Sequence, residues 1–78
     1  MSKIVIAFNI LNILLDENLH KTKEIAEKIE ISESTVRWYI NEFLSAGLQI
    51  ESTRGRRGGY ALNKENSVNS VYKLIHNN

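Results

Sequence analysis

The chain has 78 residues and a formal net charge of +1 at pH 7, and it contains neither cysteine nor proline. This length predicts a single domain, residues 1–78, with a modest core and little room for a separate effector pocket. The missing cysteines exclude a disulfide framework and a thiolate metal site, and no nucleophile–base pair, carboxylate dyad or phosphate loop suggests an enzyme.

The N-terminal segment predicts a helix from about Ser2 to Asp16. The residues that follow helical spacing and are expected to form a wide buried face are Ile4, Ala7, Phe8, Leu11, Leu14 and Leu15. Ile6 and Ile13 fall on the opposite side, and one core cannot bury both faces. Either the chain's own last helix covers this second stripe or a second copy of the chain does. We favour the dimer, because exposed apolar stripes usually have a partner.

The same segment does not have the features of a targeting sequence. Asn9 and Asn12 interrupt the apolar run, and Asp16 and Glu17 follow it without a small-residue cleavage site. The run is also too short to span a bilayer. We therefore expect a cytoplasmic protein that makes no membrane contact.

Two helices joined by a short turn are predicted next. Residues 17–21 form a link that could include a short strand, and Thr22 is expected to cap a helix over residues 22–29. The inward residues of this helix are expected to be Ile25, Ala26 and Ile29. In the turn that follows, Ile31 is expected in the core and Ser32 as the cap of the next helix. A turn of about three residues between two helices is what a helix-turn-helix motif requires.

The next predicted helix runs from about Glu33 to Ala46, and Gly47 ends it in a left-handed conformation. Its core face is expected to consist of Val36, Ile40, Phe43 and Leu44. The residues predicted to point away from the core are Ser34, Trp38, Asn41 and Ser45, with Thr35 and Arg37 at the flanks.

A hairpin and a last helix complete the chain. Residues 48–53 alternate apolar and polar as a half-buried strand does, and glycines within residues 55–59 permit a turn. Residues 60–62 are expected to form the returning strand of the hairpin. Residues 63–66 are expected to form a loop, and Ser67 to cap a helix with an apolar stripe of Val68, Val71, Tyr72 and Ile75. The predicted fold is therefore α+β: a winged helix-turn-helix with a three-helix core, a two-stranded wing hairpin and a C-terminal helix.

Positive charge is concentrated around the predicted hairpin turn. Residues 16–33 hold six acids and three lysines. Residues 52–64 hold no acid, and their cations are Arg54, Arg56, Arg57 and Lys64. A local basic cluster on a nearly neutral chain indicates a directed contact with an anion, and arginine fits a narrow minor groove of DNA or the phosphates that line it. A basic turn that meets only solvent is the alternative.

The helix over residues 33–46 offers polar groups that suit DNA. Arg37 can pair with a guanine edge or a phosphate, and Asn41 can read adenine or bond the backbone. Each of these side chains could instead meet only water, and Arg37 could form an ion pair with Glu33 or Glu42.

The starts of the two helices suit phosphate oxygens, because the positive end of the helix dipole adds to the side-chain donors. The residues expected there are Lys21, Thr22, Lys23, Ser34 and Thr35. Trp38 is included among the predicted DNA contacts, since a large indole on an outward face is costly without a function. It could contact a sugar or a thymine methyl, belong to a protein interface, or lean sideways onto Tyr39 or the hairpin.

The segment TVRWYINEFLSAGLQIESTRGRRGGYAL resembles a family of bacterial winged helix-turn-helix domains, the N-terminal domains of the biotin repressor and of WYL-domain transcription regulators. The shared features are a helix that begins S-x-S-T-V-R, an A-G-L junction, an I-E-S strand and a wing that ends R-G-G-Y-x-L. The resemblance covers roughly residues 8–62. It implies that Ser34, Thr35 and Arg37 meet DNA and that the wing arginines reach its backbone.

Two departures from that family are visible. The position of Trp38 is commonly basic or polar in the family, and the resemblance extends to the DNA-binding module alone, without the usual downstream ligase or sensing domain. The wing also resembles that of iron–sulfur-sensing regulators, but the cluster-binding cysteines are absent here, which excludes that sensing role.

Together, the residues and the resemblance predict a sequence-specific transcription regulator that binds double-stranded DNA, with repression as the default. We expect a homodimer that reads half-sites about 34 Å apart, with an interface containing Ile6, Ile13, Val71 and Ile75. No cofactor, metal or small-molecule effector is predicted. Two alternatives stay open: a winged-helix protein-interaction module, such as an antagonist of a host or regulatory protein, and a DNA-binding replication or recombination accessory of a mobile element.

Overall fold

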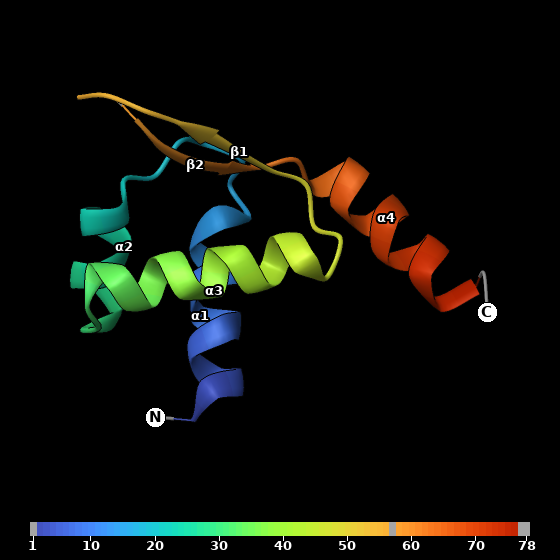
Figure 1. Cartoon of the computed structure of the whole chain (residues 1–78), viewed down its shortest axis with the longest axis horizontal. Coiled ribbons are helices and arrows are strands. Elements are labelled where there is room, and N and C mark those ends of the chain that lie inside the picture. Colours follow the sequence, from blue (N-terminus) through green and yellow to red (C-terminus); the bar gives the residue numbers. More distant parts are fainter. Residues whose placement is uncertain (1, 57, 77–78) are drawn as a thin grey trace.

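The computed structural model describes residues 2–56 and 58–76 (Figure 1). Its elements are α1 (Lys3–Leu14), α2 (Thr22–Ile29), α3 (Glu33–Ser45), β1 (Ile50–Thr53), β2 (Gly59–Leu62) and α4 (Lys64–His76). The two strands pair antiparallel, with Ile50 opposite Leu62 and Thr53 opposite Gly59. This arrangement confirms the predicted α+β winged helix-turn-helix, in which the β1–β2 hairpin is the wing.

One hydrophobic core joins the first three helices to the wing. Its buried residues are Ile10 and Leu14 of α1, Ile25 and Ala26 of α2, Val36, Tyr39, Ile40 and Phe43 of α3, and Leu62 of β2. In Figure 1, α1 and α3 cross, α2 lies beside the start of α3, and the wing covers one end of this three-helix body. The inward face predicted for α2 is confirmed, and Ile29 packs against the edge of the core.

The face that α1 turns to the core differs from the predicted one. Ile10 and Leu14 are fully buried, and Ile6 and Ile13, which were expected on the opposite side, are partly buried against the core. The residues of the predicted face that are exposed instead are Ile4, Phe8 and Leu15. Nine of the twelve residues of α1 are apolar, so helical spacing could not distinguish its faces. Contact with the other helices decides which side is buried.

The turn between α2 and α3 forms as predicted. Glu30 adopts the left-handed conformation, with φ of 58°, and ends α2. The side chain of Ile31 is partly buried and packs against the core. Ser32 caps α3, because its Oγ accepts a hydrogen bond of 3.1 Å from the Thr35 N–H.

The predicted cap of α2 is wrong by one residue. Thr22 is the first residue of the helix, and the cap position belongs to Lys21, whose side chain makes no capping hydrogen bond. The main chain of His20 pairs with that of Tyr60. Because this pairing keeps the link extended up to Lys21, the helix begins directly after it.

The buried arc of α3 includes an aromatic residue that the sequence prediction missed. Tyr39 is only 5% exposed, whereas Leu44, expected in the core, is 44% exposed. The Tyr39 ring packs against that of Phe43, with 6.4 Å between the ring centroids. After α3, Gly47 adopts φ of 98° and turns the chain toward the wing, as predicted.

The last helix begins earlier than predicted. Residues 63–66, expected as a loop, contain the first turn of α4, and Asn63 Oδ1 accepts a hydrogen bond of 2.9 Å from the Asn66 N–H. Asn63 therefore caps the helix in place of Ser67, and asparagine is among the preferred residues at such a position. Ser67 is buried, and its Oγ accepts a hydrogen bond of 2.8 Å from the Gln49 N–H. It anchors α4 beside the start of β1.

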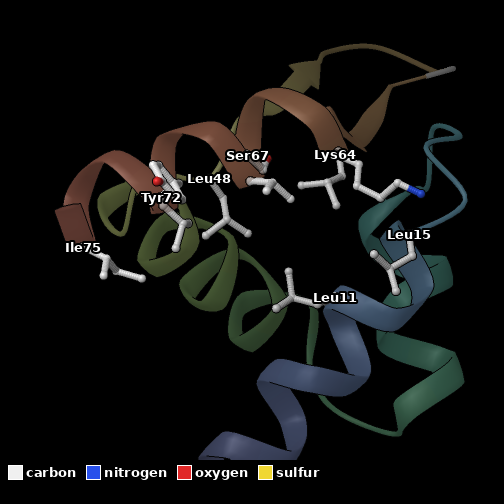
Figure 2. Close-up of a pocket in the computed structure, with 10 residues that line it drawn as sticks. Leu11, Leu15, Leu48, Lys64, Ser67, Tyr72 and Ile75 are labelled. Atoms are coloured by element: carbon white, nitrogen blue, oxygen red, sulfur yellow. The ribbon is translucent and has the colours of Figure 1, made fainter.

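The apolar stripe of α4 is left largely uncovered. The helix extends away from the three-helix body (Figure 1), and Val68, Tyr72 and Ile75 are exposed. An apolar groove of about 480 Å³ lies between α4 and α1, and Figure 2 shows Leu11 and Leu15 on its far side from α4. The predicted stripe thus lines a groove, which we call the α1–α4 groove, and takes no part in the packed core.

Candidate nucleic-acid interface

Three segments that are distant in sequence surround one polar hollow of about 490 Å³. They are the start of α2, the first half of α3 and the wing. The charged residues that line it are Lys21, Lys23, Glu33, Arg37 and Arg54. Among the described lining residues, four cations therefore meet one carboxylate, and the hollow favours an anion. We call it the basic hollow.

The structure brings together some of the predicted DNA contacts and leaves others apart. Those that line the basic hollow are Lys21, Thr22, Lys23, Arg37 and Arg54. Those on the surface outside its lining are Ser34, Trp38, Asn41 and Arg56, all of them exposed. Thr35 is partly buried, and its hydroxyl lies 2.7 Å from Ser32 Oγ. Arg57 lies outside the described residues.

Arg37 connects the basic hollow to the outward face of α3. It lines the hollow together with Arg54 of the wing. Asn41 follows it by four residues, so the two side chains are neighbours on the helix surface, and Ser34 precedes it by three. The exposed strip formed by Ser34, Arg37 and Asn41 runs along α3 and meets the hollow at Arg37. Such a strip suits a helix that follows a DNA groove.

Trp38 leans onto its neighbour, which is one of the arrangements that the sequence left open. Its ring meets that of Tyr39 edge to face, with 4.9 Å between the centroids. The Nζ of Lys3 lies 5.7 Å from the Trp38 ring centroid, which is within the range of a cation–π contact. The indole is still 49% exposed. It therefore has both an intramolecular partner and a free surface.

The main chain attaches the wing to the start of α2. The His20 N–H donates to the Tyr60 carbonyl at 2.9 Å, and the Tyr60 N–H donates to the His20 carbonyl at 2.8 Å. Gly59 permits this approach, because a Cβ at that position would collide with the His20 carbonyl oxygen. The short strand anticipated in the link is thus present as an isolated bridge to β2. It places Lys21 and Lys23 beside the wing.

The side chain of His20 lies between two carboxylates and is largely buried. Its Nδ1 is 2.6 Å from Glu24 Oε2, and its Nε2 is 2.8 Å from Asp16 Oδ1. Burial lowers the pKa of His20, but the hydrogen bonds to Glu24 and Asp16 outweigh it and hold the pKa above its ordinary value. The hydrogen bonds to His20 lower the pKa of both carboxyl groups. The place of His20 at the base of the wing was not predicted from the sequence.

The predicted dimer residues are divided between two places. Val71 and Ile75 line the α1–α4 groove, whereas Ile6 and Ile13 pack partly against the core of their own chain. The described part of the chain contains no group of three or more His, Asp or Glu placed to hold a metal ion. None of the described helices is long and apolar enough to cross a bilayer.

Comparison with known proteins agrees with this geometry. A sequence model of the HTH domain family matches residues 7–61, a span that runs from α1 into β2 and exceeds half of the chain. No curated protein and no solved structure matches the chain significantly. The chain therefore belongs to the HTH domain family, and it is a helix-turn-helix domain of the DNA-binding type that carries a wing.

Proposed function

We propose that this protein is a sequence-specific transcription regulator that binds double-stranded DNA, with α3 in the major groove and the wing on the flanking backbone or minor groove. The observation that carries the proposal is the basic hollow, where cations from α2, α3 and the wing line one concave surface. Phosphate neutralisation supplies most of the affinity of such proteins for DNA. Repression is the default sign of the regulation, by blocking access of the polymerase.

The proposal assigns different roles to the residues that contact DNA. Arg37 and Asn41 stand on the exposed strip of α3 and read base edges, where Arg suits guanine and Asn suits adenine. The residues assigned to phosphates are Lys21, Thr22, Lys23, Ser34, Thr35, Arg54, Arg56 and Arg57. Base contacts determine which sequence is preferred, whereas phosphate contacts determine the register and most of the salt dependence.

We further propose that the protein acts as a homodimer through the α1–α4 groove. A single helix of 13 residues is marginal in water unless its apolar face is packed, and α4 leaves Val68, Tyr72 and Ile75 exposed. A second copy of α4 has the matching apolar stripe. Because Ile6 and Ile13 already pack partly against the core, the interface is assigned to Val71 and Ile75 with their neighbours on the groove. A two-fold dimer would read half-sites about 34 Å apart.

Footprinting on the DNA that flanks the coding region of this protein tests the proposal. Two protected half-sites related by two-fold symmetry are expected, with affinity falling steeply as salt rises. Failure to bind any duplex at low ionic strength would refute DNA binding, and protection of one unrepeated site would refute the dimer.

A protein-interaction module is the second candidate, and the half-exposed indole of Trp38 favours it. Aromatic residues are enriched at the centres of protein interfaces. Salt separates the two candidates, because a protein contact centred on Trp38 would weaken far less between low and physiological salt than a phosphate contact. A Trp38→Ala variant that keeps its affinity for DNA but loses a protein partner would favour the second candidate.

A further inference from the structure

The chain contains a buried histidine whose two ring nitrogens both face carboxylates. His20 is 7% exposed, and its Nδ1 and Nε2 lie within hydrogen-bond distance of Glu24 and Asp16 respectively. A carboxylate only accepts hydrogen bonds, and imidazole carries an N–H on both nitrogens only in its protonated form. With both carboxyl groups ionised, this geometry favours the imidazolium form of His20.

His20 is surrounded by groups from three directions. Asp16 comes from the segment after α1, and Glu24 comes from α2, where the Nζ of Lys28 lies 3.3 Å from the same Glu24 oxygen. From β2, the main chain of Tyr60 makes both hydrogen bonds of the isolated bridge to His20. The adjacent Glu17 is turned elsewhere, since its Oε1 accepts a hydrogen bond of 2.9 Å from the Lys64 N–H. Within the described contacts, the net field at the ring is that of two carboxylates partly offset by one ammonium.

The same residue thus links the protonation of its ring to the position of the wing. Tyr60, which the His20 main chain holds, is opposite Ser52 in the hairpin. Arg54 follows Ser52 by two residues and lines the basic hollow with Arg37. Loss of the ring proton leaves a nitrogen lone pair against a carboxylate oxygen, which is repulsive. The segment from Asp16 to Glu24, which carries the bridge to β2, then loses one of the two hydrogen bonds that its carboxylates make to the ring.

We propose that His20 is a positioning residue whose imidazolium holds the wing beside α3, so that affinity for DNA falls when this ring loses its proton. The inference rests on the proposed DNA-binding function. Hydrogen bonds to charged groups are the strong ones, and the loss of one is expected to weaken DNA binding by about tenfold.

The direction of the pH dependence follows from the shifts in pKa. The pKa of His20 is raised in the folded protein, so its contribution to holding the wing is complete below the ordinary value of about 6.5 and is lost as pH rises through the raised value. The pKa values of Asp16 and Glu24 are lowered, so their contribution to the same hydrogen bonds is present above about pH 4 and is lost in more acidic solution. Between these limits the hydrogen bonds between His20 and the two carboxylates are intact. Mildly alkaline solution is therefore the side on which the wing is released.

Amide exchange without DNA is the first test. The Tyr60 N–H donates to the His20 carbonyl, so its protection factor is expected to fall about tenfold between about pH 6 and about pH 8.5. The protection factor of an amide in the middle of α3, such as Ile40, is the internal reference and is expected to stay constant. Unchanged protection of Tyr60 would overturn the inference, whether or not the protein binds DNA.

Binding of a duplex at constant ionic strength over the same pH range is the second test. The wild type is expected to bind about tenfold more weakly at the alkaline end, and His20→Gln is expected to bind weakly at both ends. Glu24→Gln should flatten the profile, because a glutamine amide can donate to the neutral ring. His76→Gln is the matched control, since His76 is exposed on α4, and it should keep the wild-type profile.

The outcomes separate the inference from the proposed function. A flat wild-type profile, or a Glu24→Gln profile that still falls, would overturn the role of His20. Absence of binding at every pH would refute the proposed function, while the exchange of the Tyr60 amide still decides whether His20 holds the wing. If His20→Gln lacks the helical circular dichroism of the wild type, Glu24→Gln and the wild type alone carry the test.

Discussion

Removal of two wing arginines should reduce the salt dependence of DNA binding by a calculable amount. Arg54 lines the basic hollow and Arg56 is exposed near the tip of the wing. Neither side chain is buried, so Arg54→Ala with Arg56→Ala should leave the fold and its unfolding free energy nearly unchanged. Each phosphate that a cation neutralises contributes about −0.9 to the slope of log K against log salt. The double variant should therefore lose about 1.8 from that slope.

The total effect can be worked from the described cations assigned to phosphates, which are Lys21, Lys23, Arg54 and Arg56. Four phosphate contacts give a slope of about −3.6, so a fourfold rise in salt weakens binding by about 150-fold. With two contacts the slope is about −1.8 and the same rise weakens binding by about 12-fold. Any contact from Arg57 would steepen both slopes equally and leave the difference unchanged.

Fluorescence anisotropy of a labelled duplex, titrated at four or more salt concentrations, measures both slopes. Lys73→Ala is the matched control, because Lys73 is an exposed cation on α4 and does not line the basic hollow. Its slope should equal that of the wild type. A double variant with an unchanged slope would remove the wing from the interface, and an equal loss in Lys73→Ala would show that net charge matters and position does not.

Three further predictions concern specificity, the core and assembly. Arg37→Ala should change which sequences are selected from a random duplex pool, and a uniform loss across sequences would reassign Arg37 to a phosphate. Ile10→Ala should lower the unfolding free energy by about 2–5 kcal/mol in urea titrations, because Ile10 is fully buried. Phe8→Ala should lower it far less, because Phe8 is 63% exposed. Equal losses in the two variants would contradict the core face assigned to α1. Val71→Glu with Ile75→Glu should give a folded monomer in sedimentation, and a persistent dimer mass would exclude the α1–α4 groove as the interface.

Local chemistry accounts for the features that could be predicted from the sequence. The turn between α2 and α3 follows from the serine cap at Ser32, whose partners lie within three residues, and the end of α3 follows from Gly47. The wing follows from the alternation of residues 48–53 and the glycines after them. Each of these signals involves neighbours in the chain. The order of the elements and the winged helix-turn-helix class could therefore be predicted from the sequence.

Where local signals were ambiguous, prediction failed. α1 is apolar on nearly every side, so its spacing was compatible with several buried faces, and only contact with the other helices selected Ile10 and Leu14. Both Asn63 and Ser67 are good capping residues. Ser67 is instead bound to the main chain of Gln49, eighteen residues away in sequence, and this leaves the cap to Asn63.

The sequence by itself determined which chemical groups this protein presents: a polar helix face with Arg37 and Asn41, and a turn rich in arginine. Only the tertiary structure decided that Lys21, Arg37 and Arg54 share one hollow and that His20 lies at the junction of the wing with α2. The physical reason is the range of the interactions. Caps, turns and helical faces depend on residues a few positions apart, whereas the hollow and the buried histidine depend on β2 returning to pair with a link about forty residues earlier in the chain.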